Sequence, residues 1–285
     1  MKFNYLIERV FASRWIAGPL STDAINVSFK LKKRHISSMI NFLGENYSND
    51  ENIKNNVDEY LKLIKKINQS NINSSISIKP TQIGLLYNKS ELYKNYSKIV
   101  ETAKKYNIIV WLDMEEHQYV DQTIDLYLSK ISSKNTGICI QSYLKRSMND
   151  VKRIVKHKGY IRLVKGAYKE SKKIAFENRE AVTKNYSDIM LYLFKKSEYF
   201  ILATHDLNMI KLSELLNKKY KRDVTYAMLN GIRNMEALRL ANSGHKMIIY
   251  IPYGTEWFKY SYRRLREASN LKLIIRSLFS RQNIN

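Results

Sequence analysis

Eight short apolar or β-branched runs recur along the chain at intervals of a few tens of residues, and this spacing constrains the fold more than any other feature. Each run is nearly continuous in hydrophobicity, which is typical of a parallel strand buried on both faces. The spacing therefore predicts parallel strands separated by longer connecting elements. The runs span residues 36–43, 75–78, 108–112, 137–140, 160–164, 199–203, 223–229 and 247–251.

Amphipathic stretches separate these runs, for example at 53–67, 91–106, 118–131, 178–196, 209–219 and 234–241. Alternating strand and helix patterns predict an α/β fold, and eight such units predict a closed (βα)8 barrel of the TIM type. We see no linker rich in Pro, Gly or Ser that would divide the chain. We therefore expect a single barrel domain over residues 1–285, with residues 1–30 as an N-terminal lead-in.

Polar or ionisable residues follow every one of the eight runs. The C-terminal ends of barrel strands meet at one mouth, where barrel enzymes carry their catalytic groups. Any one of these residues has an ordinary structural explanation, such as a turn or a helix cap, but eight in phase favour a catalytic barrel. The segments are Gly44-Glu45, Lys79-Pro-Thr-Gln82, Asp113-Met-Glu115, Gln141-Ser-Tyr143, Lys165-Gly-Ala-Tyr168, Thr204-His205-Asp206, Asn230-Gly231 and Tyr250-Ile-Pro-Tyr-Gly254.

The segment after the last run predicts a helix with an unusual face. Tyr260, Arg263, Arg264 and Glu267 are spaced i, i+3, i+4 and i+7, so they lie on one side of that helix. Two adjacent guanidiniums suit a carboxylate ligand, and a nearby Glu can hold one of them or meet an amine. A solvated charged face explains the same pattern, and taken alone the pattern slightly favours that explanation.

Composition limits the other classes of function. The formal net charge is +23, but the lysines are spread along the whole chain and do not form a local basic patch. Cys139 is the only cysteine, so no disulfide forms within the chain, and its apolar run favours a buried, inert thiol. No apolar stretch is long enough to span a bilayer, and the N-terminus lacks a signal-peptide core. We therefore expect a cytoplasmic protein, and no metal site.

Several motifs together resemble the proline dehydrogenase family, in its single-function form. They are Leu43-Gly-Glu45, Ile78-Lys-Pro-Thr-Gln-Ile-Gly-Leu85, Arg162-Leu-Val-Lys-Gly-Ala-Tyr168, Ala203-Thr-His205 and the segment from Tyr250 to Arg263-Arg264-x-x-Glu267. The similarity extends from about Arg14-Trp-Ile-Ala-Gly18 to Glu267, which is nearly the whole chain.

The resemblance implies a distorted (βα)8 barrel that binds FAD non-covalently at the strand C-termini, with a final helix over the mouth that closes on substrate. It implies oxidation of L-proline to Δ1-pyrroline-5-carboxylate, the first step of proline catabolism. A hydride would pass to flavin N5, and the electrons would then pass to a membrane quinone. The chain contains no Gly-x-Gly-x-x-Gly fingerprint, which agrees with a flavin held by a barrel.

The resemblance also implies residue roles. Lys79, Arg263 and Arg264 would hold the proline carboxylate, Glu45 would pair with Arg263 in the open site, and Asp113 and Glu267 would face the amine. The proline ring would lie between Tyr168, Tyr250 and Tyr260. The flavin would be held by Arg162 near N5, by Gln141 at the ring edge, and by Val164, Lys165, Gly166, Ala167, Thr204 and His205.

Three positions depart from the family pattern on the cofactor side. Lys169 stands where many relatives have Trp, Asp206 where Asn is common, and Ala227 lies in a segment that lacks a Gln often found there. These departures put individual FAD contacts in doubt and leave the substrate residues untouched.

Two other functions remain open from the sequence. Lys79 and Lys165 both follow strands, where a desolvated lysine serves a Schiff-base lyase or aldolase, although that function leaves the arginine pair and the tyrosines unexplained. The +23 charge fits a protein that binds nucleic acid or a lipid surface, although no nucleic acid partner is expected. A basic surface would also help a quinone-using enzyme to associate with the inner face of the membrane.

Overall fold

A closed barrel of parallel strands forms the centre of the computed structural model, which describes residues 15–131, 134–257 and 260–261. Neighbours in the barrel follow chain order, and β1 closes the ring by pairing with β8, where Ser37 aligns with Ile248. The strands are β1 (Ser37–Phe42), β2 (Ser74–Ile78), β3 (Val110–Leu112), β4 (Thr136–Gln141), β5 (Tyr160–Val164), β6 (Phe200–Ala203), β7 (Thr225–Leu229) and β8 (Met247–Tyr253).

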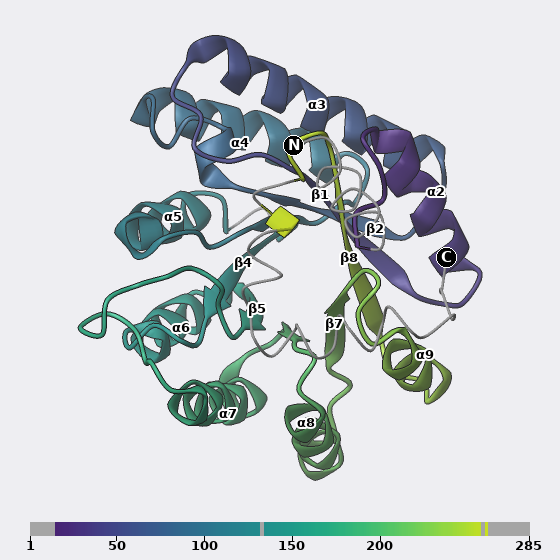
Figure 1. Ribbon diagram of the computed structural model, residues 1–285, viewed down its shortest axis with the longest axis vertical. Helices are drawn as coiled ribbons and strands as arrows, with labels where there is room; N and C mark the ends of the chain where they lie inside the picture. Colours follow the sequence, from purple (N-terminus) through teal and green to yellow (C-terminus); the bar gives the residue numbers. More distant parts are fainter. Residues whose placement is uncertain (1–14, 132–133, 258–259, 262–285) are drawn as a thin grey trace, which may run out of the picture.

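Helices surround the barrel on the outside (Figure 1). The barrel prediction is thereby confirmed, and each expected helix in the described ranges is present. The helices are α2 (Ser21–Lys32), α3 (Asp50–Gln69), α4 (Lys89–Lys104), α5 (Val120–Leu128), α6 (Ser147–Lys156), α7 (Arg179–Lys196), α8 (Leu207–Tyr220) and α9 (Asn234–Asn242), with the short 3-10 turns η1 (Pro80–Gln82) and η2 (His117–Tyr119).

Polar side chains fix where several helices begin. Asn49, Asn88 and Asn178 each accept a hydrogen bond from a backbone N–H in the first turn of α3, α4 and α7. Asp206 does the same for α8. A side-chain acceptor at this position satisfies an amide that the helix leaves unpaired, so these residues define the first turn of each helix.

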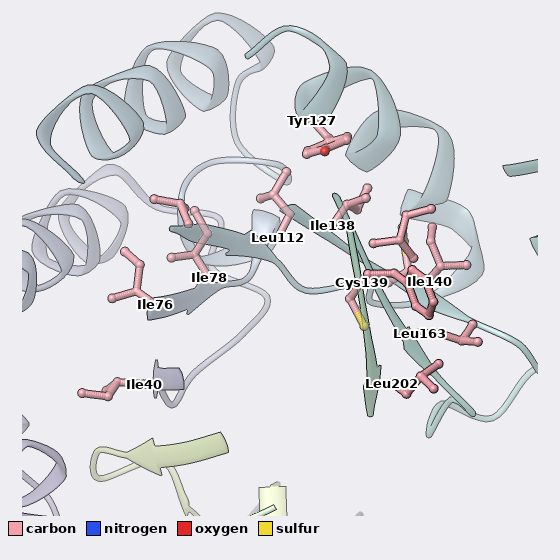
Figure 2. Packing of buried hydrophobic residues seen from close by; sticks show 14 of the residues in the cluster. Ile40, Ile76, Ile78, Leu112, Tyr127, Ile138, Cys139, Ile140, Leu163 and Leu202 are labelled. Atoms are coloured by element: carbon pink, nitrogen blue, oxygen red, sulfur yellow. The ribbon is translucent and has the colours of Figure 1, made fainter. Parts of the chain in front are cut away.

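The core has two layers. The outer layer lies between strands and helices, where Leu112 and Ile138 point toward Tyr127 of α5 (Figure 2). The inner layer fills the barrel itself and includes Met39 and Trp111. Filling by large side chains makes the barrel a packed core and not a pore.

Gly137 shows how tightly the barrel is filled. A Cβ at this position would lie 2.4 Å from Trp111 Cζ3. Only glycine lets β4 pass the indole at this distance, and Trp111 therefore closes the barrel below the mouth. None of the helices in the described ranges combines the length and the hydrophobicity needed to cross a bilayer.

Candidate active site

A cavity of about 870 Å³ opens at the C-terminal ends of the strands. This volume lies near the upper end of the range of roughly 300–1,000 Å³ that is usual for small-molecule sites. Most of the predicted site residues line it, and they come from six strands, β2 to β6 and β8, and from the segments that follow them. On the predicted substrate side they are Lys79, Asp113, Tyr168, Tyr250 and Tyr260, and on the predicted cofactor side Gln141, Arg162, Val164, Lys165, Gly166, Ala167, Thr204 and His205.

Asp113, directly after β3, is the centre of the inner part of the cavity. Its carboxylate accepts hydrogen bonds from Ser77 Oγ (2.6 Å), from Tyr250 Oη (2.9 Å) and from Arg162. Burial works to raise the pKa of Asp113, but the charges of Arg162 and Lys79 and the bonds from Ser77 and Tyr250 hold it below its ordinary value. Asp113 is therefore an ionised carboxylate at neutral pH.

Arg162 reaches the same point from the middle of β5, and its side chain is 5% exposed. The guanidinium donates to Met39 Sδ (2.7 Å) and lies 5.4 Å from the centre of the Tyr250 ring. Its Nε is buried and makes no hydrogen bond to any described residue. The barrel thus holds a fixed cation at the wall of the cavity.

Lys79 follows β2 and brings a second cation to the cavity. Its backbone N–H donates to Gln82 Oε1 (3.3 Å), and its ammonium donates to the Gly44 carbonyl (3.3 Å). The side chain is buried. Cationic Lys79 and anionic Asp113 therefore border one pocket, an arrangement that suits a zwitterionic ligand.

Tyr250 and Tyr260 give this pocket aromatic walls. Burial, and then the charge of Asp113, raise the pKa of Tyr250 well above its ordinary value, so its phenol keeps the proton that it donates to Asp113. Tyr260 is buried in a small cluster with Trp15, Ile16 and Leu43. This cluster packs the start of the last helix against the N-terminal segment.

The turn after β5 passes close to the cavity. Gly166 has φ +113°, and a Cβ there would lie 2.1 Å from Tyr143 Cδ1, so only glycine fits. Gln141 donates its side-chain amide to the Glu115 carbonyl (2.8 Å), which fixes the amide at the cavity wall. The glycine therefore lets this turn pack directly against the Tyr143 ring at the wall of the cavity.

The outer part of the cavity carries a second ion pair. Lys165 Nζ lies 2.7 Å from Asp206 Oδ2 and 2.9 Å from Thr183 Oγ1. Asp206 therefore has two contacts at once, because it also caps α8. Burial opposes it, but the bond and the charge of Lys165 lower the pKa of Asp206.

Thr204 and His205 are held by local hydrogen bonds. Thr204 Oγ1 accepts from the Asp206 N–H (3.1 Å), and His205 Nε2 accepts from the Leu229 N–H (3.0 Å). The second bond joins the ends of β6 and β7, so His205 lies at a fixed place on the cavity wall.

Of the three departures from the family pattern, two lie at the cavity. Asp206 and Ala227 line it, whereas exposed Lys169 is not among the described lining residues. Asp206 adds a negative charge to the wall, where it pairs with Lys165.

The remaining predicted residues are Glu45 and three residues of the C-terminal segment. Glu45 is buried, and within the described ranges it does not belong to the lining of the cavity. Arg263, Arg264 and Glu267, and with them the predicted final helix over the mouth, fall outside the described residues apart from Tyr260 and Ser261.

The structure adds residues that the sequence analysis had not assigned to the site. Ser77 holds Asp113, Met39 contacts Arg162, and Arg179 and Arg233 line the cavity. Strand alternation was a usable signal for Ser77, because it lies two residues before Lys79 and so faces the same way. The sequence spacing of Met39, Arg179 and Arg233 gave no indication that these residues lie at the mouth of the barrel.

Fold and site together define a (βα)8-barrel enzyme with a buried, charged pocket at the C-terminal mouth. The sequence profile of the family described as proline dehydrogenase matches residues 24–274. The chain belongs to the proline dehydrogenase family, whose members are oxidoreductases.

Curated relatives cover nearly the whole chain. Proline dehydrogenase 2 of Bacillus subtilis (strain 168) is 32% identical over 275 residues, which cover 95% of this chain and 91% of that protein. Proline dehydrogenase 1 of the same strain is 30% identical over 278 residues, with 96% and 92% covered. Proline dehydrogenase of Deinococcus radiodurans is 30% identical over 268 residues, with 90% and 86% covered.

Solved structures share the fold. Proline utilization A (PutA) from Bdellovibrio bacteriovorus, inactivated by N-propargylglycine, superposes with a TM-score of 0.87 at 20% identity and covers 97% of this chain. PutA from Corynebacterium freiburgense gives 0.80 at 19% identity and covers 96%. The chain spans about a third of the length of these PutA proteins, 34% and 32% respectively.

Proposed function

We propose that the protein oxidises L-proline to Δ1-pyrroline-5-carboxylate with bound FAD, as the first step of proline catabolism, and that residues 1–285 act as a single catalytic domain. The relatives named above support the substrate. The observation that carries the proposal is the inner pocket, where the cation of Lys79 and the ionised, triply hydrogen-bonded Asp113 border one cavity between tyrosines. Proline carries one carboxylate, one ammonium and an apolar ring, and the pocket offers a partner for each.

In this proposal the residues divide the work. Lys79 binds the carboxylate, and Asp113 attracts the ring ammonium and holds it in place. Tyr168, Tyr250 and Tyr260 pack on the ring and exclude water, which strengthens both charge contacts. Outside the described residues, Arg263 and Arg264 would add to the carboxylate site and Glu267 to the amine side, while Glu45 would pair with Arg263 when substrate is absent.

The cavity also fits a flavin. Lys165, Gly166, Ala167, Thr204 and His205 line one wall of the cavity and would hold the flavin there. Gln141 and Val164 would contact the ring system. The buried guanidinium of Arg162 would place a positive charge near N5 and favour negative charge there. The chemistry that FAD supplies when bound is acceptance of a hydride at N5.

For the onward path of the electrons we propose a quinone. The family resemblance supports it, and the excess of positive charge fits a cytoplasmic protein that associates with the anionic inner face of the membrane. The Schiff-base and nucleic-acid functions are not favoured, because neither uses the Asp113 cluster.

The experiment is a product assay with two acceptors. Purified protein is incubated with L-proline and either a soluble quinone or NAD, and the pyrroline product is identified by mass spectrometry. We expect product with the quinone and little with NAD. Failure to form product with any acceptor, in protein that has been reconstituted with FAD, would contradict the proposal.

A further inference from the structure

One buried carboxylate beside the pocket has no part in the proposed reaction. Glu115 lies two residues after Asp113, and it is 2% exposed. It is not among the described residues that line the cavity. A buried carboxylate is costly unless hydrogen bonds compensate for the lost water, so its contacts indicate what it does.

Both oxygens of Glu115 bind the same residue. Oε1 accepts from the Thr81 N–H (3.0 Å), and Oε2 accepts from Thr81 Oγ1 (2.6 Å). Two bonds to one partner fix its orientation as well as its distance. The backbone carbonyl of Glu115 in turn accepts from Gln141 (2.8 Å), so Glu115 is joined to a residue of the cavity wall.

Thr81 passes this constraint on to the loop after β1. Its Oγ1 accepts from the Asn46 N–H (3.0 Å), and its carbonyl accepts from the Tyr47 N–H (3.2 Å). Lys79, two residues before Thr81, donates back to the Gly44 carbonyl of the same loop (3.3 Å). Glu115 therefore holds the turn that carries Lys79 against the loop that carries Glu45.

We propose that Glu115 is a positioning residue that, through Thr81, sets Lys79 and the loop at Glu45 to receive the substrate carboxylate. The inference rests on the proposed function, since it takes Lys79 to be a carboxylate ligand. Loss of the Glu115–Thr81 hydrogen bonds weakens the binding of proline in the ground state and in the transition state alike. Such a loss raises KM and leaves kcat nearly unchanged.

Two substitutions separate geometry from charge. Glu115→Gln keeps a carbonyl oxygen to accept from the Thr81 N–H and an amide that can donate to Thr81 Oγ1, whereas Glu115→Ala removes both bonds. Glu116→Ala is the matched control, because Glu116 is the next residue and its carboxylate accepts from Gln118 (2.9 Å). If Glu115→Ala does not fold, Thr81→Val is the substitute: it removes the bond from Thr81 Oγ1 to Glu115 and the bond from the Asn46 N–H to that oxygen, and it is expected to act in the same direction.

The first readout is kinetic. We expect Glu115→Ala to raise KM for proline roughly tenfold, the lower end of the scale for a charge-assisted hydrogen bond, because the bond from Lys79 to the substrate is weakened and not removed. The turnover number should change less than twofold, and Glu115→Gln and Glu116→Ala should stay near the wild type. If wild-type protein turns over proline and Glu115→Ala keeps its KM, the inference is wrong.

The second readout does not depend on turnover. Lysine acetylation with acetic anhydride, mapped by mass spectrometry, reports how firmly Lys79 is held, with exposed Lys94 as the internal reference. We expect acetylation of Lys79 to increase severalfold in Glu115→Ala and to stay unchanged in Glu115→Gln. If the wild type does not oxidise proline while this pattern holds, the proposed function fails and the positioning of Lys79 stands. Unchanged labelling in Glu115→Ala would overturn the positioning.

Discussion

Two ion pairs border the same cavity and differ in how much water reaches them. The side chains of Arg162 and Asp113 are 5% and 13% exposed, whereas those of Lys165 and Asp206 are 32% and 27% exposed. Each pair joins a basic side chain to the carboxylate of an aspartate from another part of the barrel. One cation is a guanidinium and the other an ammonium, but the largest difference between the two pairs is their access to solvent.

The difference divides the site into two parts. In the dry inner part, charge interactions are strong and each carboxylate must be fully satisfied, which Ser77 and Tyr250 achieve for Asp113. In the wetter outer part, water can replace a lost partner, and a change of residue such as Asp206 is tolerated. We infer that the inner part fixes the reacting groups, while the outer part adjusts affinity for the cofactor.

Breaking the inner pair tests this division most strongly. We expect Asp113→Asn to leave Arg162 buried without its counter-charge and to lower the free energy of unfolding by about 3–5 kcal/mol. Proline turnover should fall with it. Urea unfolding of the reconstituted protein measures the first effect, and a steady-state assay measures the second.

A double variant supplies the control. Asp113→Asn combined with Arg162→Met removes both charges, so it should recover part of the lost stability without recovering activity. Additive losses in the double variant would show that the two residues do not act as a pair.

Glu115 gives a second test of the dry region, through pH. Burial raises the pKa of Glu115 to about 7, against the opposing effects of the Thr81 bonds and the charge of Lys79, while Glu45 adds to the rise. Between its ordinary value of 4.5 and about 7, the folded protein binds a proton that the unfolded chain has lost. The contribution of Glu115 to the free energy of unfolding is therefore fully present below pH 4.5. It is lost as the pH rises to 7, by about 3 kcal/mol in all.

Glu115→Gln removes this dependence. We expect the variant to match the wild type near pH 4.5 and to be more stable above pH 7, as measured by urea unfolding across the range. A constant difference at every pH would mean that Glu115 does not titrate in this window.

Much of the fold was predictable from the sequence, because strand and helix periodicity is local. The run at 160–164 coincides with β5, and the strand predicted at 108–112 differs from β3 by two residues at its start. Helix α6 had not been singled out among the expected helices, although eight strand–helix units required a connection there.

The pairing of side chains in the site was less predictable. Alternation along a strand indicates that Lys79 or Asp113 faces the mouth. The shear of the barrel, however, decides which side chains of different strands meet. The contacts of Arg162 with Asp113 and Met39 were therefore not predictable from the sequence. Glu115 was visible as a polar strand end, yet its turn toward Thr81 depends on where β3 ends.

Substitution of Lys79 should affect the binding of proline and not the stability of the fold. We expect Lys79→Ala to raise KM for proline by roughly 10- to 150-fold, the equivalent of losing a charged hydrogen bond of about 1.5–3 kcal/mol. FAD affinity, followed by titration of the apoprotein, should change little. An unchanged KM would mean that Lys79 does not contact the substrate.

The outer pair should give the smallest effect. We expect Asp206→Asn to change the free energy of unfolding by no more than about 1 kcal/mol, since water screens the pair. Freed from its counter-charge, Lys165 should bind the anionic cofactor more tightly, so the Kd for FAD should fall severalfold. A loss of stability as large as that of Asp113→Asn would remove the distinction between the two regions.

The most direct measurement is anaerobic reduction of the bound flavin. Protein reconstituted with FAD is mixed with L-proline under argon while its visible flavin absorbance is followed, and D-proline and Asp113→Asn serve as controls. We expect L-proline to bleach the wild-type flavin, with D-proline and the variant far slower. A wild-type flavin that stays oxidised in excess L-proline, but is bleached by a chemical reductant, would contradict proline oxidation at this site.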